Sequence, residues 1–257
     1  MGPHAITAGR NHLWVANVLA DSITELGIGG RPVRVISGPP LDTPTAMALF
    51  GARLWVVNSG ADSIAEFNAD TGAPIASFTN YGLSNPDALA VSNRRLWVAN
   101  AANGTVTELD AATGSLIATL RGLHLSDPVC EVASQTRLWV ASEATGSITE
   151  VNTVTGAVVR VISGPAYRID GPSAMTLADG RLWIASTQGN SVTEIDEATG
   201  RLIGVLAGRP YGFAGPSGIL AYKGRLWVTN LTANTITEIL PAVPAPGRSG
   251  TPGKRPS

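Results

Sequence analysis

Six tryptophans at nearly constant spacing constrain the fold of this chain more than any other feature. They are followed by Val or Ile, are preceded by Leu, and stand at Trp14, Trp55, Trp97, Trp139, Trp183 and Trp227. The intervals between them are 41, 42, 42, 44 and 44 residues. A Pro lies eleven residues before each Trp and a Glu lies eleven residues after it. The chain is therefore built from six copies of one unit.

Within one unit the pattern predicts four short strands. In the second copy they cover residues 44–49, 53–57, 63–67 and 74–78, which are rich in β-branched and apolar residues and are bounded by Gly, Asn, Asp or Pro. Residues 68–72 open on Asn and end on Gly, as expected for a hairpin turn. Four strands in a period of 41–44 residues are typical of a β-propeller blade. The sequence predicts an all-β, six-bladed β-propeller with four antiparallel strands per blade.

The two ends of the repeat array depart from this pattern. The units begin near residues 3, 44, 86, 128, 172 and 216, so we expect the propeller to occupy residues 1–243. The sixth unit has no recognisable outer strand after Leu240, which makes the last blade incomplete. Three sources for that strand are left open: the tail, another chain, or none. Residues 244–257 are rich in Pro and Gly with basic residues, which predicts a disordered tail. We expect blade six to pack on blade one and close the ring.

Residues that recur in every unit are expected to serve the fold. The tryptophans are predicted to fill the interfaces between blades. An Arg lies two residues before each Trp, except that His12 takes this place in the first unit. Because the second and third strands form a hairpin, each of these side chains is expected to reach the recurrent Glu of its own unit.

Composition excludes several classes of protein. Only 14% of the residues are charged and the net charge is −1, so we expect no nucleic-acid partner. Cys130 is the one cysteine, which excludes an internal disulfide and a Cys-based metal site. No apolar run is long enough to span a membrane, and we expect no membrane partner. No signal peptide is recognisable, which predicts a cytoplasmic protein, with secretion left open if the N-terminus is missing.

Candidate ligand-binding residues lie on the rim that carries the connections between blades. The length from each Glu to the next Pro varies from 19 to 22 residues, and variable loops over a fixed scaffold are typical of a binding face. The connections carry aromatic and imidazole side chains: Tyr81, His124, Tyr167, Tyr211 and Phe213. The same rim carries Asn17, Asn58, Asn100 and Asn230, three residues after a Trp. Packing of the aromatic rings and capping of the loops by the Asn side chains are the structural alternatives.

The mouth of the central channel offers weak catalytic candidates. His4 and Asp87 directly follow the first Pro of their units, and Glu131 stands where the other units have an apolar residue. These three side chains could hold a cation or perform acid–base chemistry. A solvated channel and structural pairing of Glu131 are the alternatives.

Several segments resemble a known superfamily. Residues 3–9 (PHAITAG), 13–17 (LWVAN) and 103–110 (NGTVTELD) resemble NHL-type propeller repeats and the streptogramin (virginiamycin B) lyase-like branch. The resemblance implies the propeller fold over residues 3–240. Streptogramin lyases are seven-bladed and use Mg²⁺ with a His base from the late blades. No His follows His124 here, so those residues have no counterpart.

Together these observations favour a monomeric binding module that recognises a protein, peptide or glycan through one rim, without a metal or other cofactor. The alternative is an enzyme of the streptogramin-lyase or hydrolase type that acts in the channel mouth with a divalent cation such as Mg²⁺.

Overall fold

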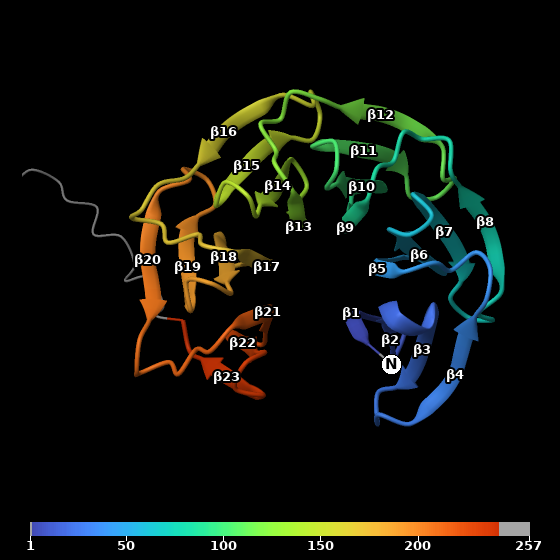
Figure 1. Ribbon diagram of the computed structural model, residues 1–257, viewed down its shortest axis with the longest axis horizontal. Helices are drawn as coiled ribbons and strands as arrows, with labels where there is room; N and C mark the ends of the chain where they lie inside the picture. The colour runs from blue at the N-terminus through green and yellow to red at the C-terminus, as the bar shows by residue number, and fades with distance from the viewer. Residues whose placement is uncertain (1, 242–257) are drawn as a thin grey trace, which may run out of the picture.

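The computed structural model describes residues 2–241, and these residues form six small antiparallel sheets arranged around a central axis (Figure 1). The predicted tail at 244–257 and the predicted domain end at 243 lie outside the described residues. Blades 1 to 3 consist of β1(Pro3–Gly9), β2(His12–Asn17), β3(Ser22–Gly27), β4(Pro32–Ser37), β5(Pro44–Phe50), β6(Arg53–Asn58), β7(Ser63–Asn68), β8(Pro74–Phe78), β9(Pro86–Ser92), β10(Arg95–Asn100), β11(Thr105–Asp110) and β12(Leu116–Leu120). Blades 4 to 6 consist of β13(Pro128–Ala133), β14(Arg137–Ser142), β15(Ser147–Asn152), β16(Val158–Ile162), β17(Pro172–Ala178), β18(Arg181–Ser186), β19(Ser191–Asp196), β20(Leu202–Ala207), β21(Pro216–Tyr222), β22(Arg225–Asn230) and β23(Thr235–Ile239).

These elements confirm the predicted six-bladed, all-β architecture. Five sheets have four strands and the sixth, β21–β23, has three. Apart from the strands, the described residues contain one short 3-10 helix, η1(Val18–Ala20), and no helix among them is long and apolar enough to cross a bilayer. Each first strand begins at the Pro that the repeat predicted, because Pro lacks an N–H and suits the start of a strand.

Five hydrophobic clusters form the core, and each joins two consecutive blades. In each cluster the Trp of one blade packs against the second and third strands of the next. Trp14 meets Leu54 and Val56, for example, and Trp183 meets Leu226 and Val228. The predicted role of the first five tryptophans is confirmed, since each is at most 2% exposed.

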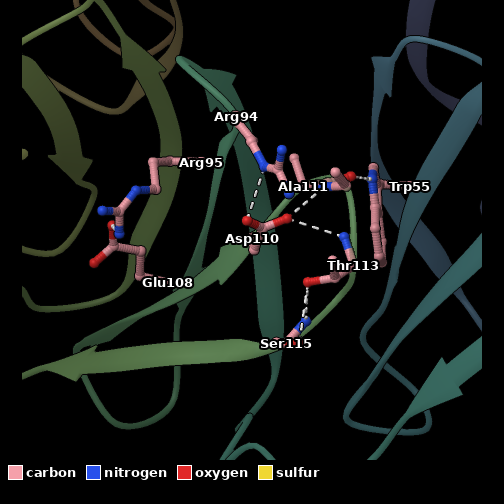
Figure 2. A network of polar contacts seen from close by, with 9 residues as sticks. Trp55, Arg94, Arg95, Glu108, Asp110, Ala111, Thr113 and Ser115 are labelled. Atoms are coloured by element: carbon pink, nitrogen blue, oxygen red, sulfur yellow. Dashed lines mark hydrogen bonds and ion pairs between the residues drawn. The ribbon is translucent and has the colours of Figure 1, made fainter.

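A polar network supports the contact between blades 2 and 3 (Figure 2). The indole Nε1 of Trp55 donates to the carbonyl of Ala111, 3.1 Å away in the hairpin turn of the next blade. The Asp110 carboxylate accepts the N–H of Thr113 at 3.0 Å and pairs with the Arg94 guanidinium at 2.9 Å. These bonds hold the pKa of Asp110 below its usual value, and the hydrogen bond from Arg94 contributes most. The turn is thereby fixed in the position that receives the indole.

Blade six does not pack on blade one, so the expected ring closure is wrong. Strands β21–β23 and β1–β4 lie on opposite sides of a gap (Figure 1). None of the clusters formed by residues 2–241 unites these two blades. The reason is geometric: five inter-blade interfaces turn the six sheets through less than a full circle.

The predicted pairs between the recurrent Arg and Glu are confirmed in blades 2 to 6, and His12 pairs with Glu25 in blade 1. In each hairpin the Glu stands directly opposite the Trp, which brings its carboxylate diagonally to the Arg. The outer strands add cations that the repeat did not reveal. Arg34 contacts Glu25, and Arg160 contacts Glu150 at 2.7 Å.

The Arg–Glu pairs differ in burial, so we expect replacement of the Arg by Ala to destabilise some blades more than others. Glu150 is buried between Arg137, at 2.8 Å, and Arg160. Arg137→Ala removes one of its two cations and is expected to lower the free energy of unfolding by about 2 kcal/mol. Arg225→Ala, in a half-exposed pair of blade 6, is expected to cost less than about 1 kcal/mol. Urea denaturation of the two variants measures the difference, and equal losses would contradict this account of the pairs.

Candidate functional site

Two adjoining clefts hollow the connection-bearing rim over blades 4, 5 and 6. The first, of about 670 Å³, lies between the loop 143–146 and residues 164–170, with residues 188–189 at its end. The second, of about 900 Å³, lies between residues 187–190, 207–208 and 213–215. Arg168, Gln188 and Gly189 line both clefts. The two clefts therefore form one continuous depression, which we call the rim cleft.

The two longest connections between blades form part of the walls of the rim cleft, and the loops 143–146 and 187–190 within blades 4 and 5 form the rest. The count from Glu to the next Pro is 22 residues from blade 4 to 5 and from blade 5 to 6, and 19 or 20 before that. Each long connection begins with a tight turn, in which the N–H of Tyr167 or Tyr211 donates to the carbonyl of Gly164 or Gly208.

One hydrogen bond joins blade 5 to the connection before blade 6 beside the rim cleft. The side-chain oxygen of Asn190 accepts the N–H of Gly215 at 2.7 Å. Asp21 and Asp62 make the equivalent bond to the next blade in the first two repeats. This bond is thus a recurrent contact between consecutive blades, and in blade 5 it holds two loops that border the rim cleft against each other.

Charged side chains of both signs line the first half of the cleft. Arg168 is exposed, and its Nη2 donates to the carbonyl of Gly189 at 3.1 Å. Glu143 and Asp170 are exposed acids on the opposite walls. Glu143 also acts on the channel mouth, where it contributes to the raised pKa of Asp87. The arrangement suits a polar ligand with at least one cationic group.

The predicted aromatic residues of the rim mostly pack within the protein. The hydroxyls of Tyr81 and Tyr167 donate to Gly114 and Gly200 in the turn of the next blade. Tyr211 stacks on Phe213 with ring centroids 5.6 Å apart. Phe213 is nearly buried and lines the second half of the cleft, whereas exposed His124 lies outside both linings. The packing alternative thus accounts for the tyrosine contacts, and ligand contact stays a prediction.

The four asparagines lie beneath the rim rather than on it. They are buried, and their side-chain amides donate to the hydroxyl of the first residue of the following strand: Asn17, Asn58, Asn100 and Asn230. Three of them also accept an N–H from the preceding connection. These contacts give the asparagines a structural role, and the cited bonds end on the following strand and not on the loop that the capping alternative expected. A ligand contact by these amides stays a prediction that their burial does not favour.

The three channel candidates occupy different environments. His4 Nδ1 lies 3.0 Å from the carbonyl of Thr45. Burial raises the pKa of Asp87, while the nearby His4 lowers it and Asp127 and Glu143 raise it further. Glu131 instead turns toward the preceding blade, where its Oε1 accepts the Ala90 N–H at 3.1 Å. His4 and Asp87 therefore interact, and Glu131 is engaged with the sheet.

The donor set does not fit a divalent cation. Within residues 2–241, no three His, Cys, Asp or Glu side chains come together in an arrangement that could hold a metal ion. The imidazole of His4 and the carboxylate of Asp87 are two donors of different kinds, and Mg²⁺ prefers oxygen ligands.

Sequence reasoning missed most of the side chains that line the rim cleft. Arg168, Asp170 and Gln188 belong to no recurrent position, and their directions depend on the fold of the connections. A signal was present in the lengths of those connections, which indicated this rim. The aromatic residues, in contrast, stand at a recurrent position: Tyr81, Tyr167 and Tyr211 each lie five residues before the Pro of the next blade. Such recurrence indicates packing.

Comparisons with known proteins add a family and a fold. Residues 11–204 match the family model described as outer membrane protein assembly factor BamB. No curated protein matches the sequence.

Solved structures of similar shape include two lyases and a designed protein. A streptogramin B lyase is 22% identical, with 94% of this chain and 84% of that chain covered and a TM-score of 0.77. A catalytically inactive virginiamycin B lyase from Staphylococcus aureus with quinupristin is 19% identical, with 92% and 80% covered and a TM-score of 0.79. The computationally designed Ika8 protein is 16% identical, with 92% and 70% covered and a TM-score of 0.71. At these identities the likeness shows the fold, as the lyase resemblance implied, and it does not show NHL-type repeats.

Proposed function

Because this chain belongs to the family of the outer membrane protein assembly factor BamB, we propose that it is a binding module for other polypeptides. The observation that carries the proposal is the rim cleft over blades 4 to 6, with its long walls and mixed charges. We infer that the ligand is a peptide segment of a partner protein that carries a Lys or Arg residue. The name of the family describes a protein that acts on proteins, which supports this class of ligand.

Two features favour a cationic peptide. Glu143 and Asp170 are acidic side chains that line the first half of the cleft. The one cationic side chain of the lining, Arg168, already donates to Gly189. The local field therefore favours a positively charged group, which steers its approach and fixes its register.

A glycan is less well supported. Sugar rings stack on exposed aromatic faces. The hydroxyls of Tyr81 and Tyr167 instead donate to the next blade, and the Tyr211 ring stacks on Phe213 within its own connection. Peptides instead need backbone partners and a few charged contacts, which the loop 143–146 and Gln188 can offer.

Selection from a library of random peptides displayed on phage tests the proposal. We expect enriched sequences to contain Lys or Arg. The double variant Glu143→Gln/Asp170→Asn is expected to bind them about tenfold more weakly, which corresponds to about 1.4 kcal/mol. The melting temperature should not change, because both side chains are exposed. Asp179→Asn is the matched control, since it removes one exposed acid from the turn at the opposite end of β18.

The outcomes separate the ligand classes. Enrichment of basic peptides with loss in the double variant alone would support the rim cleft. Equal binding by all variants, or no enrichment from the library, would contradict it. Binding on a glycan array that persists in the double variant would replace the peptide with a sugar ligand at another place.

A further inference from the structure

The loops on the two rims of the propeller differ in charge. Within residues 2–241, the loops of the connection-bearing rim contain six acids and three arginines, a net charge of −3 with His neutral: Asp21, Asp42, Asp62, Asp127, Glu143, Asp170, Arg121, Arg168 and Arg209. The turns of the opposite rim, which we call the turn-bearing rim, contain three acids and five bases, a net charge of +2: Asp70, Asp179, Glu197, Arg10, Arg31, Arg94, Arg201 and Lys223. A cationic segment is therefore attracted to the rim that holds the cleft and repelled from the other.

The sequence of this chain contains such a segment directly after blade 6. Residues 242–257, which lie outside the described residues, contain three basic residues and no acid: Arg248, Lys254 and Arg255. They also contain Pro244, Pro246 and Pro252. Proline cannot donate to a strand ladder, so this sequence does not suit the outer strand that blade 6 lacks among the described residues. Its composition suits a contact with an acidic surface instead.

The segment is long enough to reach the rim cleft of its own chain. Ile239 pairs with Leu226 near the start of β22, so the chain leaves β23 at the turn-bearing rim. Crossing back along the five residues of β23 takes about 17 Å. The thirteen residues from Pro241 to Lys254 span about 45 Å when extended. About 28 Å then remains to cover the two sheet spacings, about 20 Å, that separate blades 6 and 4.

The first half of the cleft offers two carboxylates to the two adjacent cations of the segment. Glu143 and Asp170 are exposed on opposite walls, and neither carboxylate has a hydrogen bond or an ion pair within residues 2–241. Successive side chains of an extended segment point to opposite sides. Lys254 and Arg255 are thereby suited to contact the two walls at once. Thr232, just before β23, lines the second half of the cleft and marks where the segment enters.

We propose that residues 248–255 of this chain bind in its own rim cleft, with Lys254 and Arg255 at Glu143 and Asp170, and that a partner peptide displaces them. The inference rests on the proposed function, because it takes the rim cleft as a site for basic peptides and adds an intramolecular competitor. A short tether gives an effective concentration on the order of 1 mM. A segment that binds with a Kd of about 0.2 mM then lowers the affinity for a partner peptide about sixfold.

A nitroxide attached through Ser257→Cys reports where the segment lies in the full chain. Burial raises the pKa of the Cys130 thiol, which keeps this thiol from taking the label at neutral pH. We expect the amide resonances of Gly146 and Gly189, in the cleft, to broaden more than those of Gly180 and Gly224, in the turn-bearing rim. The broadening should not depend on protein concentration and should fall in 1 M salt, where the Debye length is about 3 Å.

Variants of the full chain locate the contact. Glu143→Gln/Asp170→Asn in the cleft and Lys254→Gln/Arg255→Gln in the segment are each expected to abolish the difference between the rims. Asp179→Asn is the matched control, because it removes an exposed acid from the turn-bearing rim, and it should leave the broadening unchanged.

Titration with a free peptide copying residues 242–257 measures the competition. The variant Arg248→Gln/Lys254→Gln/Arg255→Gln removes the charge of the tethered segment and keeps the cleft intact. We expect this variant to bind the free peptide about sixfold more tightly than the parent chain does. Equal affinities in the two chains would contradict an intramolecular competitor.

The outcomes separate this inference from the proposed function. Broadening in the cleft that both double variants abolish supports the inference. Broadening that survives Glu143→Gln/Asp170→Asn, or that is equal on both rims, would overturn it, and broadening that grows with protein concentration would assign the cleft to the segment of a second copy. If the cleft does not broaden but still binds the free peptide, the intramolecular contact alone is wrong and the proposed function stands. If the free peptide does not bind either, both are contradicted.

Discussion

Trp139→Ala is expected to lower the free energy of unfolding by about 3–5 kcal/mol, and Trp227→Ala by about 1 kcal/mol or less. The two tryptophans hold the same position in their repeats. Trp139 is 1% exposed and packs against Leu182 and Ile184 of the next blade, so its removal leaves a cavity. Trp227 has no following blade to contact within residues 2–241. Chemical denaturation measures both losses.

This comparison isolates the interface from the residue. Both variants remove the same side chain from the same place in a hairpin, opposite Glu150 or Glu238. A difference therefore reports the neighbouring blade and not an effect within the strand. Similar losses in the two variants would mean that blade 6 has a partner in the free chain.

The second large effect is a dependence of stability on pH that originates at Glu131. Its Oε1 accepts the Ala90 N–H, and its buried Oε2 has no hydrogen-bond partner among the described residues. Burial raises the pKa of Glu131 from its ordinary value of 4.5 to about 8, although backbone hydrogen bonds from Ala90 and Ala99 lower it. The folded chain therefore keeps a proton that the unfolded chain has lost at neutral pH.

The sign of the effect follows from proton linkage. Between pH 4.5 and about 8 the folded state binds more protons than the unfolded state at this site, so the free energy of unfolding falls as pH rises. The favourable contribution is complete below the unfolded pKa and is lost as pH rises through the folded one. The difference of the two pKa values sets an upper bound of about 5 kcal/mol on the loss.

Glu131→Gln tests this assignment. Glutamine keeps an oxygen for the Ala90 N–H and carries no charge, so the variant is expected to be more stable than the parent at pH 8 and to show a shallower pH profile. Burial also raises the pKa of Glu108, Glu150 and Glu194, whose contributions remain in both proteins and cancel in the difference. Urea denaturation from pH 5 to about 8.5 measures it. Parallel profiles would rule out Glu131 as the origin.

Much of the fold followed from the sequence because the repeat fixes it locally. The strand starts, the hairpin pairing and the Arg–Glu contacts each depend on residues within one unit. The second cation on Glu25 and Glu150 escaped notice, since Arg34 and Arg160 lie on outer strands that vary between units. The sequence also did not predict the gap between blades 6 and 1, for a different reason. Neighbouring blades meet through the same residue types whatever the angle between them, so the pattern does not encode the closure.

The sequence predicted which rim holds the candidate site, but it did not predict the side chains that line the cleft. Lengthened connections after blades 4 and 5 indicated the rim that holds the cleft. The side chains that line it, such as Arg168 and Gln188, depend on backbone turns that a single sequence does not define. The aromatic residues were expected there for their chemistry, and the structure instead uses Tyr81 and Tyr167 to join blades.

The central claim of this account is that the repeated tryptophan builds five sealed interfaces and leaves a sixth face open. Fluorine NMR of the chain labelled with 5-fluorotryptophan measures this most directly, since the solvent isotope shift in D₂O reports the exposure of each ring. We predict that one of the six resonances shifts with solvent and that Trp227→Phe removes it. Six insensitive resonances would show a ring that closes on itself, and several sensitive ones would contradict the sealed interfaces.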